Sequence, residues 1–174
     1  MPKGGIHVCD ADCLINLYRH FGRKATRALR DLGKKGFVKL PEGVVREIIH
    51  STDKLARVVR TQQQHFEVAA QHHPALHREI PRLERLYGEK IRVGTLEYGG
   101  FWRSKGGRKA ADAQVVAVAK LLKGVAVSDD GAVKLACALE GVPCIGWSEF
   151  ARHFGLIKPR QLDLGLGSGA TSGR

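Results

Sequence analysis

Short apolar runs alternate along the chain with segments that repeat apolar residues at helical spacing. The apolar runs predict five strands, at 6–9, 37–40, 91–93, 124–127 and 142–145. The helical spacing predicts helices at 13–18, 23–32, 41–49, 110–122 and 132–139. This alternation is typical of an α/β protein, and we expect a three-layer α/β/α fold around a central, mostly parallel sheet.

The middle of the chain is less regular than its two ends. From Asp53 to Leu86 the pattern predicts mostly helix, interrupted at Pro74 and Pro81 and rich in Arg, Gln and His. The last residues are rich in Gly and Ser, which is typical of a flexible segment. We therefore expect one domain over residues 1–160 with a helical, basic insertion around 52–105, followed by a flexible tail over 161–174.

Composition and charge narrow the class of protein. The 174 residues include 29 Lys and Arg against 17 Asp and Glu, a net charge of +12, and 43% are hydrophobic. That apolar content is too high for a disordered polycation, and the charge predicts an anionic partner such as nucleic acid or an acidic protein. No apolar run is long enough to span a membrane and no signal-peptide core is present, so we expect a cytoplasmic protein without membrane contact.

Cysteine and histidine give weak signals for a metal site. Cys9, Cys13, Cys137 and Cys144 fall in predicted core segments and form no C-x-x-C pair, which favours reduced, packed thiols over zinc. Four of the eight histidines are close in sequence, at positions 65, 72, 73 and 77. Because Pro74 interrupts that segment, an exposed polar helix is the better interpretation.

Acidic residues stand where the pattern otherwise predicts apolar side chains or the ends of strands. Asp10 directly follows the first strand, and Asp129 and Asp130 follow the strand at 124–127. Ligands of open parallel sheets bind beyond the carboxyl ends of the strands. Both acidic positions are therefore expected at the edge of the sheet where a site would form.

Two further acids lie on predicted helices at the border of the apolar stripe. Asp112 begins the inward face of the helix at 110–122, and Glu47 is adjacent to Ile48 in the helix after Pro41. Taking a carboxylate out of water is costly without compensation, and Mg²⁺ or Mn²⁺ would supply it with a hard cation. Each acid taken singly also fits a helix cap, a turn or a surface ion pair, but the four together favour a metal site.

The order of these motifs resembles the PIN-domain ribonucleases, and in particular the VapC-like toxins of bacterial and archaeal toxin–antitoxin pairs. The similarity covers about residues 5–150 and is carried by short motifs in order: Val8-Cys9-Asp10-Ala11-Asp12, Leu40-Pro41-Glu42-Gly43-Val44-Val45-Arg46-Glu47, Ala111-Asp112 and Val127-Ser128-Asp129-Asp130. The resemblance implies that the family's catalytic, metal-binding acids fall on Asp10, Glu47, Asp112 and Asp130. Asp129 would be an additional metal ligand.

The resemblance also implies an activity and partners. It implies hydrolysis of RNA phosphodiester bonds with Mg²⁺ or Mn²⁺, in which a metal ion lowers the pKa of a water nucleophile and offsets charge on the phosphate. It further implies a homodimer and a cognate antitoxin protein that covers the acidic pocket.

Basic residues would then contact RNA around the acids. Just before Asp112 there is a Gly-containing basic loop preceded by two aromatic residues, and the predicted RNA contacts are Trp102, Arg103, Lys105, Arg108 and Lys109. Phe101 beside them is a second candidate for stacking on a base. From Arg19 to Lys39 there are eight basic residues against one acid, which fits either RNA contact or a solvated helix face.

Two other functions fit part of the sequence. Asp10-Ala11-Asp12 together with Ser128-Asp129-Asp130 is similar to the acid motifs of haloacid-dehalogenase-like phosphatases, although Glu47 and Asp112 then have no role. A non-catalytic RNA-binding or antitoxin-binding module is the third possibility, and the four acids argue against it.

Overall fold

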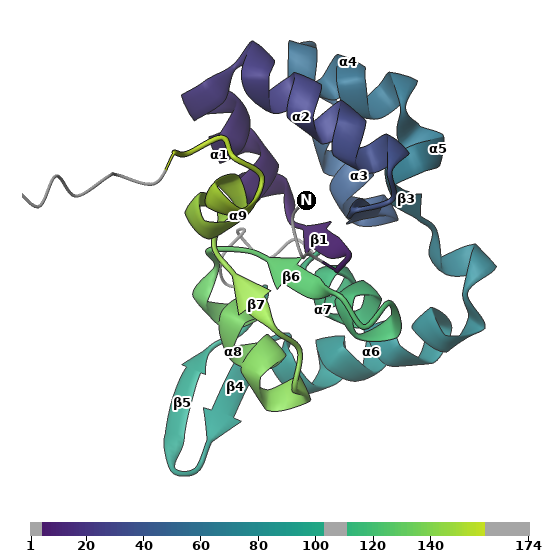
Figure 1. Cartoon of the computed structure of the whole chain (residues 1–174). Helices are drawn as coiled ribbons and strands as arrows, with labels where there is room; N and C mark the ends of the chain where they lie inside the picture. The colour runs from purple at the N-terminus through teal and green to yellow at the C-terminus, as the bar shows by residue number, and fades with distance from the viewer. Residues whose placement is uncertain (1–4, 103–110, 159–174) are drawn as a thin grey trace, which may run out of the picture.

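A computed structural model of the chain describes residues 5–102 and 111–158, and it has an α/β architecture. The central sheet has five strands in the order β3-β2-β1-β6-β7, and every neighbouring pair is parallel (Figure 1). The strands are β1 (His7–Cys9), β2 (Val38–Pro41), β3 (Glu67–Val68), β6 (Val125–Val127) and β7 (Cys144–Ile145). The expected parallel sheet is thus confirmed.

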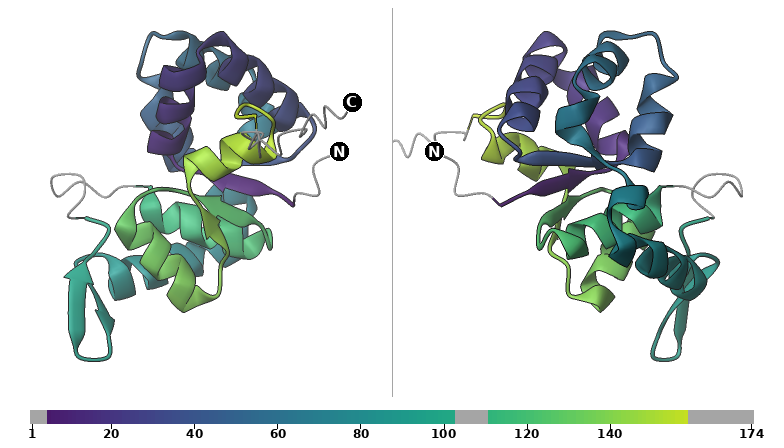
Figure 2. Two further views of the ribbon diagram at one scale, coloured as in Figure 1. Left: turned by 60° about the vertical axis from the view of Figure 1, so that its left-hand side comes forward. Right: turned by 90° about the vertical axis from the view of Figure 1, so that its right-hand side faces the viewer.

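Helices cover both faces of the sheet, which confirms the three-layer α/β/α fold (Figures 1 and 2). One layer contains α1 (Ala11–Phe21), α2 (Arg23–Lys34), α4 (Lys54–Thr61), α5 (Gln63–Phe66) and α9 (Trp147–His153). The opposite layer contains α6 (Pro74–Tyr87), α7 (Asp112–Leu121) and α8 (Gly131–Glu140). The short α3 (Glu42–Ile49) follows β2, and the 3₁₀ turn η1 (Ala70–His72) precedes α6.

The core lies on both sides of the sheet and explains the sequence pattern. The strands are short and read as continuous apolar runs because both of their faces are covered, and Val8, Leu40 and Ala126 are fully buried. Helix α7 is buried on nearly all sides because it lies between the sheet and α6. Its apolar sequence therefore reflects two packing partners.

The third strand of the central sheet differs from the one expected. The run at 91–93 forms β4 (Lys90–Val93), which pairs only with β5 (Leu96–Gly99) in a separate antiparallel hairpin. The central sheet instead gains β3, whose two residues are too few to give a periodic signal. The predicted insertion at 52–105 is thus not only helical: it contains a strand of the main sheet and a projecting hairpin (Figure 2).

Pro81 does not interrupt its helix, contrary to the expectation. Helix α6 runs from Pro74 to Tyr87 with Pro74 in its first turn and Pro81 inside it. A proline inside a helix costs about 3 kcal/mol, so packing must offset that cost. Leu76 and Leu83, on either side of Pro81, are both buried and supply this packing.

An ion-pair network ties α6 to α7 and α8. Glu79 accepts hydrogen bonds from Arg82 (2.7 Å) and Lys120 (2.8 Å), and Lys120 also donates to Glu140 (2.7 Å). Glu140 is further held by Arg82 and by the Tyr87 hydroxyl (2.8 Å). The hydrogen bond from Arg82 is the main cause that lowers the pKa of Glu79 to about 2. Burial acts to raise the pKa of Glu140, but the three donors outweigh it and hold that pKa at about 2 as well.

We expect this network to make the protein less stable in acid. Both carboxyl groups have a lower pKa in the folded chain than their ordinary value of 4.5, so the folded state binds fewer protons. Their contribution to the free energy of unfolding is complete above pH 4.5 and is lost as the pH falls toward about 2. Urea denaturation at a series of pH values measures this loss. Glu140→Gln should flatten the pH dependence in this window, and an unchanged slope in that variant would contradict the role of Glu140.

Candidate active site at the carboxyl edge of the sheet

Asp10 and the Asp129-Asp130 pair lie at the carboxyl ends of two adjacent strands. Cys9 at the end of β1 is in register with Val127 at the end of β6. The backbone N–H of Asp10 donates to the carbonyl of Val127 at 3.1 Å, so Asp10 lies beside Ser128. The expectation that these acids meet at one edge of the sheet is confirmed for this pair of strands.

The Asp10 carboxylate is buried and held as a helix cap. Its side chain is 5% exposed, and Oδ1 accepts a hydrogen bond from the backbone N–H of Cys13 at 2.6 Å. This bond satisfies one of the donors left open at the start of α1 and fixes the carboxylate at the end of β1. A carboxylate in this position is oriented by backbone and needs little reorganisation to bind a ligand.

Asp130 and Asp129 have different surroundings although they are adjacent. Asp130 caps α8: its Oδ1 accepts from the N–H groups of Ala132 (2.8 Å) and Val133 (3.1 Å). Asp129 is about half exposed, accepts from the N–H of Trp147 (3.1 Å) and pairs with Lys134 (3.1 Å). Asp129 is therefore engaged by α8 and by the start of α9.

Asp112 lies at the N-terminus of α7 and is 3% exposed, as its place on the inward face predicts. Helix α7 precedes β6, and its far end returns to the amino edge, where the N–H of Val125 donates to the carbonyl of Ile6 (2.8 Å). The N-terminus of α7 must consequently lie toward the carboxyl edge. Asp112 therefore lies at the carboxyl edge of the sheet, where Asp10 also lies.

Glu47 reaches the start of α7 from α3. Its Oε1 accepts from the N–H of Ala111 at 3.4 Å, directly before Asp112. A second bond joins the same two helices, because the N–H of Gly43 donates to Oε1 of Gln114 at 2.9 Å. The Glu47 side chain is exposed and does not share the buried surroundings of Asp112. A Cβ on Gly43 would lie 2.9 Å from the Cβ of Ala111, so glycine permits this close approach.

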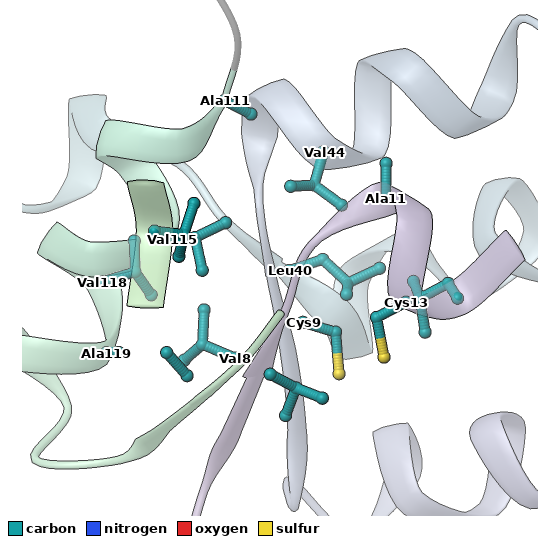
Figure 3. Packing of buried hydrophobic residues seen from close by; sticks show 14 of the residues in the cluster. Val8, Cys9, Ala11, Cys13, Leu40, Val44, Ala111, Val115, Val118 and Ala119 are labelled. Atoms are coloured by element: carbon teal, nitrogen blue, oxygen red, sulfur yellow. The ribbon is translucent and has the colours of Figure 1, made fainter. Parts of the chain in front are cut away.

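The N-terminal turns of three helices thus surround the ends of β1 and β2. Figure 3 labels one residue near each acid at this end of the core. Ala11 is next to Asp10, Ala111 is next to Asp112, and Val44 is one helical turn before Glu47. Gln114 is the residue that the sequence reasoning missed here. A polar residue within the apolar run 113–119 is the signal that would have indicated it.

The acids do not form a ready-made metal cage. Among residues 5–102 and 111–158, no group of three or more His, Cys, Asp or Glu side chains is arranged to hold a metal ion, and this includes the histidines at 65–77. Mg²⁺ usually retains several water molecules and takes only one or two carboxylates together with substrate phosphates. The donor chemistry of Asp10, Asp112 and Glu47, which is all carboxylate oxygen, suits such a sparsely held ion.

A pocket of about 470 Å³ lies beside the Asp129-Asp130 turn. It follows the exposed side of α1 and is lined by Asp12, Cys13, Ile15, Asn16, Arg19, Asp129 and Asp130. Asp12 and Arg19 are exposed, two turns apart on the same helix. The pocket therefore contains three acids and the cation Arg19.

The cysteines are packed thiols, as expected. All four are free; Cys9, Cys13 and Cys137 are buried and Cys144 is half-buried. Figure 3 shows the sulfur atoms of Cys9 and Cys13 next to each other below α1. Burial is the main cause that raises the pKa of the Cys13 thiol, which keeps it protonated.

Of the five predicted RNA contacts, Trp102 belongs to the described part of the chain. Arg103, Lys105, Arg108 and Lys109 lie outside the described residues. Trp102 is half-buried against Gly88 and lines a pocket of about 670 Å³ with Arg85, Lys90 and Arg92. Phe101 is 1% exposed and packs against Tyr87 with ring centroids 6.1 Å apart, so the idea that it stacks on a base is wrong.

These features define an α/β protein with a carboxylate-rich site at the carboxyl edge of a parallel sheet. Comparison with known proteins adds no family: no protein-family model matches the chain, and no curated protein matches its sequence. Within the described part of the chain, none of the helices combines the length and apolar character needed to traverse a bilayer.

Proposed function

We propose that the protein is a Mg²⁺- or Mn²⁺-dependent endoribonuclease of the PIN-domain type. The observation that carries the proposal is the contact between Glu47 and the N–H of Ala111, which brings the second predicted acid to the residue directly before the third, Asp112. Asp10 lies beside Ser128 at the same edge of the sheet. Residues spread over more than a hundred positions thus lie at the same edge of the sheet.

The protein's own groups would act mainly by position. Asp10 and Asp130 are fixed by backbone donors, so their carboxylates are held for ligand binding without a change of fold. Asp112 is buried and brings a third carboxylate to this edge of the sheet, and Glu47 adds a fourth from the exposed side. These carboxylates would hold a divalent ion, which would supply a water of lowered pKa and offset negative charge on the phosphate. The net charge of +12 favours the approach of a polyanion to this acidic centre.

Cleavage of RNA under controlled metal conditions tests the proposal. The purified chain is incubated with an end-labelled structured RNA in Mg²⁺, in Mn²⁺ or in EDTA, and in parallel with a small phosphomonoester. We expect RNA cleavage with either metal and none in EDTA. Release of phosphate from the monoester without RNA cleavage would favour the phosphatase alternative. RNA binding without hydrolysis of either substrate would favour the third alternative, a non-catalytic RNA-binding module.

We also propose a homodimer and a small protein antitoxin, on the resemblance alone. The mass in solution tests the first point: light scattering during gel filtration should give about twice the 19.1 kDa of one chain. Co-expression with the product of the adjacent reading frame tests the second. A stable complex in which RNA cleavage is suppressed is the expected result.

A further inference from the structure

Helix α2 carries a straight stripe of exposed cations. Arg23, Arg27, Arg30 and Lys34, here named the α2 stripe, are spaced by four, three and four residues, and all are exposed. At about 100° per residue these positions fall within an arc of about 60°, opposite the buried Ala25 and Leu29. With a rise of about 1.5 Å per residue, the stripe is about 16 Å long.

This arrangement of charge disfavours the helix that carries it. Like charges three and four residues apart repel each other along the whole stripe. The first turn of α2 has two cations and no acid, and Gly22 provides no side-chain cap, so these charges also oppose the helix dipole. The one acid of α2, Asp31, lies off the stripe and contacts Arg30 at 3.6 Å, with both side chains about half exposed. A local arrangement that works against the fold is expected where a ligand requires it.

The stripe begins close to the candidate active site in the chain. Arg19, in the last turn of α1, lines the pocket that also contains Asp129 and Asp130. Gly22 then turns the chain with φ of +51°, and Arg23 opens α2. Cations therefore continue along the chain from Arg19, which lines this pocket, onto the next helix.

We propose that the α2 stripe binds the phosphate backbone of the RNA strand that flanks the cleavage site. This inference rests on the proposed nuclease function for the identity of the polyanion. A strand of RNA presents negative charges at regular intervals, and successive cations on one helix face contact successive phosphates without reading the bases. Three of the four cations are arginines, whose planar guanidinium groups bind phosphate oxygens in pairs.

An acidic protein is a less suitable partner for this surface. The centre of a protein–protein interface is depleted of charge and needs apolar or aromatic groups. Within the described residues, the large exposed apolar side chains are Leu86, Val93, Leu96, Tyr98 and Leu139, and none of them lies on α2. A stripe of cations without an apolar centre fits a nucleic-acid backbone.

The salt dependence of RNA binding tests the stripe. Binding of a short fluorescent single-stranded RNA is followed by anisotropy in EDTA, which stops metal-dependent cleavage, over a series of KCl concentrations. Changing all four stripe residues to Gln should weaken binding and reduce the slope of log Kd against log salt by about 0.7 for each lost contact, about 2.8 in total. The two double variants, Arg23→Gln with Arg27→Gln and Arg30→Gln with Lys34→Gln, should each lose about half of this amount. They also guard against a misfolded quadruple variant.

The matched control removes the same charge from exposed positions elsewhere, with Gln at Arg78, Lys123, Arg152 and Lys158. Its slope should stay close to that of the unmodified protein. Equal losses in the control and stripe variants would show only an effect of net charge and would overturn the proposal. Binding of polyglutamate that is as tight as that of RNA and equally dependent on the stripe would also overturn the proposal, because it would favour an acidic protein as the partner. If the protein cleaves RNA in an EDTA-sensitive way but the salt slope of the stripe variants is unchanged, the proposal for the α2 stripe is rejected and the proposed nuclease function stands. If RNA binding depends on the stripe but no cleavage occurs, only the proposed nuclease function is rejected.

Discussion

Replacing Asp112 with Asn is expected to abolish RNA cleavage while the protein remains folded. Asn has nearly the same shape as Asp but carries no charge, so it fits the buried place at the start of α7 and cannot hold a divalent cation as tightly. Loss of a group that only supports a metal ligand already costs about 10–100-fold in activity, so loss of a ligand should exceed about 100-fold. The rate of cleavage in Mg²⁺ at saturating protein measures the effect.

Two further measurements separate a chemical effect from a structural one. The free energy of unfolding of Asp112→Asn should be unchanged or slightly higher, because one negative charge is removed close to Glu47. Asp53→Asn is the matched control: Asp53 caps α4 through Oδ1 at 2.8 Å, and Asn is an equally good cap. The control should cleave RNA normally. Full activity in Asp112→Asn would refute the assignment of the site.

The position of three acids at the carboxyl edge of the sheet could be predicted, because it follows from local signals in the sequence. An apolar run followed by Asp10, and another followed by Asp129 and Asp130, places these acids at strand ends, and parallel pairing then brings the strand ends together. The buried position of Asp112 followed from helical spacing alone. These signals need no knowledge of which helix packs on which.

Other parts depend on packing that no local pattern encodes. The bond from Ala111 to Glu47 joins residues 64 positions apart, and the exposure of Glu47 depends on how α3 lies against α7. Strand β3 is too short to show a period. The hairpin did have a signal in the sequence, because Gly94-Thr95 between two short runs with apolar residues is typical of a two-residue turn. The positive φ of Gly94 agrees with this signal.

The largest change in stability is expected from Phe150→Ala. Phe150 in α9 is fully buried, and its ring centroid lies 4.7 Å from that of Phe154 and 5.4 Å from that of His7. Removing a buried phenylalanine ring costs about 3–5 kcal/mol, which is a large part of the total stability of a domain. Urea denaturation at neutral pH measures the loss. Leu139→Ala on α8 is the control, because Leu139 is 44% exposed and should change stability by about 0.5 kcal/mol or less.

The same variant should also change how stability depends on pH. Burial is the main cause that lowers the pKa of His7 from its usual 6.5, and the nearby His153 lowers it further. A lowered pKa means that the folded state binds fewer protons, so the contribution of His7 is complete above pH 6.5 and is lost as the pH falls below it. Phe150→Ala admits water next to the imidazole and should reduce this loss. A large drop in stability with an unchanged pH dependence would show that Phe150 fills the core without controlling the ionisation of His7.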